Sequence, residues 1–152
     1  MPAEDDTIDA LNDLIEVCKD GEYGFRLSAE NLGSNELANI FVGRAERCRL
    51  AALELRAVVE QLGGTAEAGG TTAGALLRSW LNLKAALAGF TDDEILEATQ
   101  RAEGAALVRY RQALQRSLTP TARAVVQQQF AGVQHNDDLV QALRARTRMA
   151  LA

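Results

Sequence analysis

Four long segments of this chain carry apolar residues at alternating spacings of three and four, and this spacing constrains the fold more than any other feature. Such a period places apolar side chains on one face of an α-helix. Proline occurs only at positions 2 and 120, so no proline interrupts a helix between them. In the first segment, the residues that follow the period are Ile8, Leu11, Ile15, Cys18, Glu22, Phe25, Ala29 and Leu32.

The period predicts helices over residues 7–32, 35–62, 92–118 and 120–147. Gly33 follows the first helix, where a helix-terminating glycine is common, and a Gly-Gly pair follows the second. Thr91 and Glu94 have the spacing of a capping box, in which each side chain binds the other residue's backbone N–H. Pro120, preceded by threonine, is typical of the first position of a helix.

The linkers within the first and second pairs of helices are short, so each pair is expected to form an antiparallel hairpin. Residues 63–90 join the pairs through a Gly- and Thr-rich loop and a short amphipathic helix at about 73–88. A helix of about 28 residues is roughly 42 Å long, and this connection is long enough to return along it. The sequence therefore predicts a single all-α domain, residues 1–152, folded as a four-helix bundle with one long crossover.

Charge and composition exclude some partners. The net charge of −5 disfavours nucleic acid, because phosphate binding needs a basic face. The basic run Arg144, Arg146, Arg148 is interpreted as cations near a helix C-terminus rather than as a binding patch. No signal core and no run of about 18 apolar residues is present, so a membrane is not an expected partner. Cys18 and Cys48 lie among apolar residues and are expected to be buried thiols in a cytoplasmic protein, with a disulfide or a metal role as the alternatives.

Several stretches share their pattern with one known family: residues 12–25, Leu62-Gly63-Gly64, residues 74–84 around Trp80, Glu103, and residues 110–114. Through these stretches, the chain resembles over nearly its whole length a bacterial family of four-helix-bundle proteins known only as a domain of unknown function. The resemblance implies a ferritin-like fold and does not imply an activity. The family pattern has a His-Asp pair near residue 134, where this chain has Asp137-Asp138 and its one histidine, His135, two positions earlier.

A metal site in the bundle core is one hypothesis for the function. A di-iron carboxylate bundle takes a Glu from each of two helices and a Glu-x-x-His from each of the other two. This chain has one histidine and no Glu-x-x-His. The candidate ligands are Glu22 and Glu103 on the inward faces, with His135 and Asp137 on the fourth helix, and iron or manganese as the ion. The favoured alternative is that the two glutamates form ion pairs with arginines at the bundle rim, among Arg26, Arg44, Arg49 and Arg109.

Glycines recur at a similar level of all four predicted helices, close to the two glutamates, and indicate close helix approach or a small cavity: Gly21, Gly24, Gly43, Gly104 and Gly132. The chain has no nucleophile-elbow or phosphate-loop signature, so no catalytic residue is assigned. The sequence favours a non-catalytic bundle that acts by association in stress physiology. The alternatives are a metal-binding redox or storage protein and a small-molecule-binding cavity. The segment around Trp80 is expected to pack on its own bundle, with a homodimer surface as the alternative.

Overall fold

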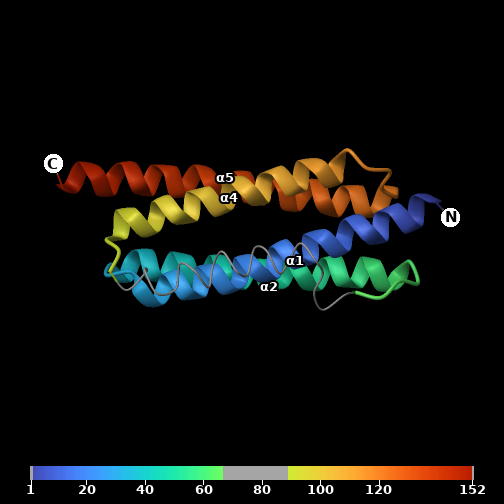
Figure 1. Cartoon of the computed structure of the whole chain (residues 1–152), viewed down its shortest axis with the longest axis horizontal. Coiled ribbons are helices and arrows are strands. Elements are labelled where there is room, and N and C mark those ends of the chain that lie inside the picture. The colour runs from blue at the N-terminus through green and yellow to red at the C-terminus, as the bar shows by residue number, and fades with distance from the viewer. Residues whose placement is uncertain (1, 67–88, 152) are drawn as a thin grey trace.

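The computed structural model describes residues 2–66 and 89–151, and these residues form four helices and no strand. The helices are α1 (Pro2–Asn31), α2 (Asn35–Gln61), α4 (Asp92–Leu114) and α5 (Pro120–Leu151) (Figure 1). The all-α prediction with four long helices is confirmed. The short helix expected at 73–88 lies outside the described residues.

The helices are arranged as two antiparallel hairpins that lie side by side (Figure 1). One hairpin is α1 with α2 and the other is α4 with α5, and the hairpins meet where α1 packs on α4 and α2 on α5. Figure 1 shows α4 beginning at the end of the bundle where α1 meets α2, far from the end of α2. Helices α2 and α4 therefore run parallel, which requires a connection that returns along the bundle. None of the described helices is both long and apolar enough to cross a lipid bilayer.

The core consists of two apolar clusters at different levels of the bundle. One includes Leu14, Ile15, Leu55 and Val126, and the other is built around Phe25, Phe41, Ile95 and Val140. The rings of Phe25 and Phe41 meet edge to face with centroids 5.4 Å apart. The residues of the predicted inward faces therefore form the core, and each cluster draws on all four helices.

Hydrogen bonds tie the two hairpins together at both ends of the bundle. Asp92, at the start of α4, accepts hydrogen bonds from the backbone N–H groups of Gly33 (2.8 Å) and Ser34 (3.1 Å) in the α1–α2 turn. At the other end, Asp6 of α1 accepts from the backbone N–H of Ser117 (2.9 Å) and pairs with Arg116 in the α4–α5 linker. These hydrogen bonds lower the pKa of Asp6, with the Arg116 side chain as the largest cause.

Two helix ends differ from the expected ones for reasons that the structure makes plain. Helix α4 ends at Leu114 rather than at 118, because Arg116 and Ser117 turn away to bind Asp6. Gly33 does not take the left-handed conformation expected of a helix-terminating glycine; among the described residues only Gly63 does, with φ +79°. The capping box of Thr91 and Glu94 is confirmed, with both reciprocal hydrogen bonds formed.

The basic run near the end of α5 pairs with acidic residues of neighbouring helices. Arg144 reaches Glu97 at 3.1 Å and Asp93 at 3.3 Å, and Arg148 reaches the same Asp93 at 3.2 Å. Arg146 lies 3.0 Å from Glu36 of α2. The run therefore neutralises carboxylates across the bundle, a role that the interpretation as helix-end cations did not include, and α5 continues past 147 to Leu151.

We expect Asp92→Ala to lower the free energy of unfolding by about 1–2 kcal/mol, since it removes two hydrogen bonds to a charged acceptor that lie near the surface. Urea denaturation at neutral pH measures the change. Asp138→Ala is the matched control, because Asp138 is exposed on α5, and it should change stability by less than about 0.5 kcal/mol. Equal stability of the two variants would contradict a stabilising role for the bonds between Asp92 and the α1–α2 turn.

Candidate functional site

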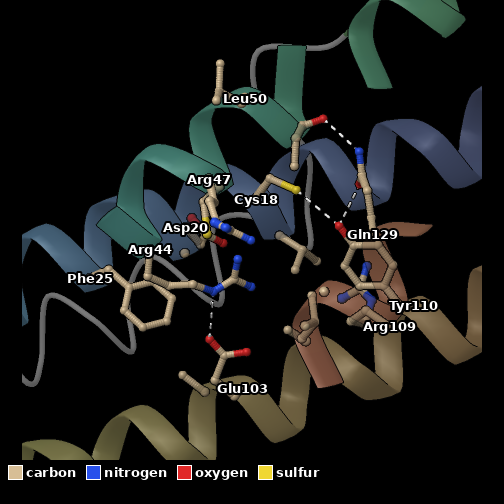
Figure 2. Close-up of a pocket in the computed structure, with 18 of the residues that line it drawn as sticks. Cys18, Asp20, Phe25, Arg44, Arg47, Leu50, Glu103, Arg109, Tyr110 and Gln129 are labelled. Atoms are coloured by element: carbon tan, nitrogen blue, oxygen red, sulfur yellow. Dashed lines mark hydrogen bonds and ion pairs between the residues drawn. The ribbon is translucent and has the colours of Figure 1, made fainter. Parts of the chain in front are cut away.

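A cavity of about 520 Å³ lies at the middle of the bundle and is lined by all four helices (Figure 2). Its walls carry side chains from both apolar clusters, such as Val17, Val133 and Phe25. Ligand pockets in proteins have volumes of roughly 300–1,000 Å³, apolar walls and a few convergent polar groups. The polar residues that line this cavity include Cys18, Asp20, Arg44, Arg47, Cys48, Glu54, Glu103, Arg109, Tyr110 and Gln129.

Glu103 is the most deeply buried carboxyl group on the cavity wall, with only 3 % of the residue exposed. Its Oε1 accepts a hydrogen bond from Asn136 of α5 at 2.7 Å and lies 3.6 Å from Nε of Arg44 on α2. Its Oε2 is buried and has no hydrogen-bond partner in the described part of the chain. Burial raises the pKa of Glu103, while Arg44 and Asn136 act in the opposite direction.

Arg44 extends from α2 across the cavity toward Glu103 (Figure 2). Its side chain is 12 % exposed, and its guanidinium carbon lies 5.7 Å from the centre of the Phe25 ring, within the range of a cation–π contact. Its Nε–H has no hydrogen-bond partner among the described residues, because 3.6 Å from Glu103 is too long for a hydrogen bond. Arg44 therefore balances the charge of Glu103 without satisfying either group fully.

Asp20 of α1 is a second buried carboxyl group on the same cavity, with 8 % of the residue exposed. Its Oδ2 also has no hydrogen-bond partner within the described ranges. Burial raises the pKa of Asp20 to about 6, and the like charge of Glu16, one turn earlier on α1, adds to the shift. We refer to Asp20, Arg44 and Glu103 as the polar trio, since each contributes a buried polar atom with an unfilled hydrogen-bond position.

Another part of the cavity wall carries a hydrogen-bonded chain that joins all four helices. Tyr110 donates its O–H to Gln129 at 2.9 Å, and the Cys18 thiol lies 3.3 Å from the Tyr110 oxygen. The Gln129 amide in turn donates to the Ala51 carbonyl at 3.2 Å and to Glu54 at 2.8 Å. Figure 2 shows this chain running across the upper part of the cavity. The polar atoms of this wall are thus satisfied by one another, unlike those of the polar trio.

The two cysteines are neutral thiols at physiological pH. Burial raises the pKa of Cys18 to about 11 and that of Cys48 to about 12. A thiol with a raised pKa is a poor nucleophile, because the thiolate is the reactive form. Both are free, and the Cys48 sulfur packs so closely on Gly21 that a Cβ there would lie 3.0 Å from it. The cysteines are therefore small, unreactive wall residues, and Cys18 also contacts the Tyr110 hydroxyl.

The four residues that were proposed as metal ligands have different surroundings in the structure. Only Glu103 lines the cavity. Glu22 lies 3.2 Å from Arg26 on its own helix, His135 is exposed on α5, and Asp137 accepts a hydrogen bond from Gln141 at 2.9 Å. Residues 2–66 and 89–151 contain no group of three or more His, Cys, Asp or Glu side chains that could hold a metal ion. Glu22 and Glu103 instead face arginines, as in the ion-pair alternative.

Sequence reasoning missed Asp20 and did not assign a role to Asn136. Asn136 and Gln129 fall on the inward face of the fourth helix, and polar residues at such positions are a usable signal because a buried amide needs partners. Asp20 gave no signal, since it lies off the apolar face of α1. Of the glycines expected to form a layer, Gly21 and Gly132 line the cavity, whereas Gly24, Gly43 and Gly104 do not.

In a comparison with known families, residues 6–116 match the family described as a domain of unknown function, DUF2383. The matched region contains the whole polar trio and ends before α5. Gln129 and Asn136 therefore come from outside it. Among curated proteins, none matches this chain.

The raised pKa of Asp20 predicts a stabilising substitution. The folded state holds a proton on Asp20 up to about pH 6, whereas the unfolded chain releases it near 3.8, so this residue makes the free energy of unfolding fall as pH rises between these values. We expect Asp20→Asn to be more stable than the wild type by about 1–2 kcal/mol at about pH 8, and equally stable near pH 4.

Thermal or urea unfolding at both pH values measures the difference between Asp20→Asn and the wild type. Asp9→Asn makes the same change at an exposed position of α1 and should show no such pH dependence. A variant that gains no stability at the higher pH would show that Asp20 is well solvated in its ionised form.

Proposed function

Since this chain belongs to the family described as a domain of unknown function, DUF2383, we propose its function from the cavity: the bundle binds a small molecule there, with the polar trio as the specific contact. The observation that carries the proposal is that three residues of one cavity, Asp20, Arg44 and Glu103, each have a buried polar atom (Oδ2, Nε and Oε2) with no hydrogen-bond partner in the described part of the chain. Leaving a buried polar atom unpaired costs roughly 1–3 kcal/mol, and more for a charged group. A bound molecule that fills these positions removes that cost.

The apolar walls support an organic ligand rather than water alone. The cavity is bounded by small apolar side chains on three helices, including Ala51, Ala102, Ala106 and Val133. Water would satisfy the polar trio and leave these walls poorly solvated, whereas an amphipathic molecule matches both regions. No step of a reaction follows from this arrangement, because the thiols on the wall are neutral and the Tyr110 hydroxyl is committed to Gln129.

Gly132 offers a way to fill the cavity without disturbing its walls. An added Cβ at Gly132 meets no heavy atom within 4 Å, and the same is true of Gly104, but only Gly132 lines the cavity. We expect Gly132→Leu to weaken the binding of phenylbutanol, an amphipathic probe, at least about tenfold, since the leucine side chain occupies the space. Isothermal titration calorimetry on the full chain measures the affinity.

Gly104→Leu is the matched control and should bind phenylbutanol as the wild type does. Both variants should fold at least as stably as the wild type, because replacing a helical glycine removes a penalty of up to about 1 kcal/mol. Equal binding by both variants would show that phenylbutanol binds elsewhere, and the absence of binding by the wild type would contradict the proposal.

A metal-dependent redox or storage role is the second candidate, and the unfilled Oε2 of Glu103 favours it. Glu22, Glu103, His135 and Asp137 stay a prediction as ligands, although their described positions do not form one ligand set. Metal analysis of protein purified without chelator decides the matter. Stoichiometric iron or manganese that is lost in a Glu22→Ala, Glu103→Ala double variant would favour this role over the organic ligand.

The proposal also covers the superfamily, the cellular location and association with other chains. Membership of the ferritin-like superfamily is supported by the parallel course of α2 and α4, which a bundle with one long crossover requires (Figure 1). Two free buried thiols support a reducing, cytoplasmic location. Association with a second copy or with another protein in stress physiology is supported by exposed apolar side chains on α2, namely Val42, Leu50 and Leu53. Sedimentation at several concentrations tests self-association.

A further inference from the structure

The buried carboxylates of the cavity differ in their partners, and this difference bears on the chemistry of the molecule that binds there. Arg44 faces Glu103 at 3.6 Å, so these two buried charges offset each other. Asp20 has no such partner among the described residues that line the cavity: the neighbouring charge that acts on its carboxyl group is that of Glu16, which has the same sign. Arg47 and Arg109 also line the cavity, but Arg47 is exposed, Arg109 is half-buried, and neither forms an ion pair with Asp20 within the described residues. Asp20 is therefore the buried carboxylate on this wall that lacks an ion-pair partner in the described part of the chain.

The unfilled hydrogen-bond positions also favour a ligand that donates hydrogen bonds. Two of the three orphaned atoms, Asp20 Oδ2 and Glu103 Oε2, are acceptors, and only Arg44 Nε is a donor. A ligand that satisfies them must donate more hydrogen bonds than it accepts at its polar end. An ammonium group has three N–H donors and a positive charge, and hydrogen bonds between ionised groups are the stronger kind.

We propose that the molecule bound in this cavity is a protonated amine with an apolar body, whose nitrogen donates hydrogen bonds to Asp20 and Glu103. This inference rests on the proposed function. The apolar body lies against Val17, Ala106 and Val133, on the walls next to the polar trio. The cation supplies the counter-charge that Asp20 lacks, and its N–H groups donate to the acceptor atoms of both carboxylates.

Two other ligand classes fit less well. A carboxylate that bound Arg44 would take it from Glu103 and leave two buried carboxylates without a counter-charge, and one that bound Arg47 or Arg109 would leave the two acceptor positions of the polar trio unfilled. An alcohol has one O–H donor, so it satisfies one of the two acceptors and leaves the charge of Asp20 unmatched. An ammonium group is the class that both provides a counter-charge for Asp20 and donates to the two unfilled acceptors.

The test compares phenylbutylamine, phenylbutanol and phenylbutyrate, which share an apolar body and differ in the polar end. Binding to the full chain is measured by calorimetry at about pH 8, where Asp20 is ionised. We expect phenylbutylamine to bind at least about tenfold more tightly than phenylbutanol, and phenylbutyrate to bind most weakly. Asp20→Asn should reduce the affinity for phenylbutylamine about tenfold and change that for phenylbutanol less than about twofold. Asp9→Asn, the exposed control on α1, should change neither.

Each other outcome decides a different point. Equal affinities for the amine and the alcohol, both lost in Gly132→Leu, would overturn the amine assignment and leave the cavity as the binding site. Tightest binding of phenylbutyrate would also overturn it and identify an arginine of the cavity wall as the specific contact. An amine preference that survives Asp20→Asn would place the cation away from Asp20 and contradict the proposal. If no probe binds the wild type, both the ligand class and the proposed function are wrong.

Discussion

The packing of one hairpin against the other is the interaction on which the rest of this structure depends. It is apolar at two levels, around Leu14 and Leu55 toward one end and around Phe25 and Phe41 toward the other. Hydrogen bonds to Asp92 and Asp6 hold the same hairpins together at their two ends. Because these contacts fix the helices on both sides, the level between them does not have to be densely packed. The cavity occupies that level, and residues of both apolar clusters form part of its walls.

The polar trio destabilises the fold that holds it. Burial of Asp20 and Glu103 disfavours their ionised forms, and the ion pair of Glu103 with Arg44 is too long to recover the hydrogen bonds that each lost. Asparagine or leucine at such positions would serve a bundle that only had to be stable. Unpaired polar atoms that lie together in one cavity are instead typical of a site whose hydrogen bonds are completed by a ligand. Proteins commonly lose stability at such sites.

The sequence predicted the helices and their faces because those depend on local spacing, and it predicted the capping box of Thr91 and Glu94 for the same reason. It could not tell how deeply each carboxylate is buried, because long-range geometry decides that. A straight helix drifts by about 20° per heptad relative to a strict seven-residue repeat, so a position in register with Ile8 and Ile15 is rotated toward the rim by the level of Glu22. There its side chain meets Arg26, whereas Glu103, close to the middle of α4, stays inside. Asp20 is buried although the period of α1 places it outside the apolar face, and no pattern within one helix could have shown that.

Two parts of the cavity wall differ in how well their polar atoms are satisfied, and this difference orients a ligand that has one polar end. On one wall, the chain from Cys18 through Tyr110 and Gln129 to Glu54 satisfies its own polar atoms, so a ligand gains little by contacting it with a polar group. On the other wall, the polar trio has unfilled positions, so a polar group gains most there. A molecule with one polar end is therefore oriented by the difference between the walls. The orientation depends on α5 as well as on the matched family region, since Gln129 closes one wall and Asn136 holds Glu103 in place on the other.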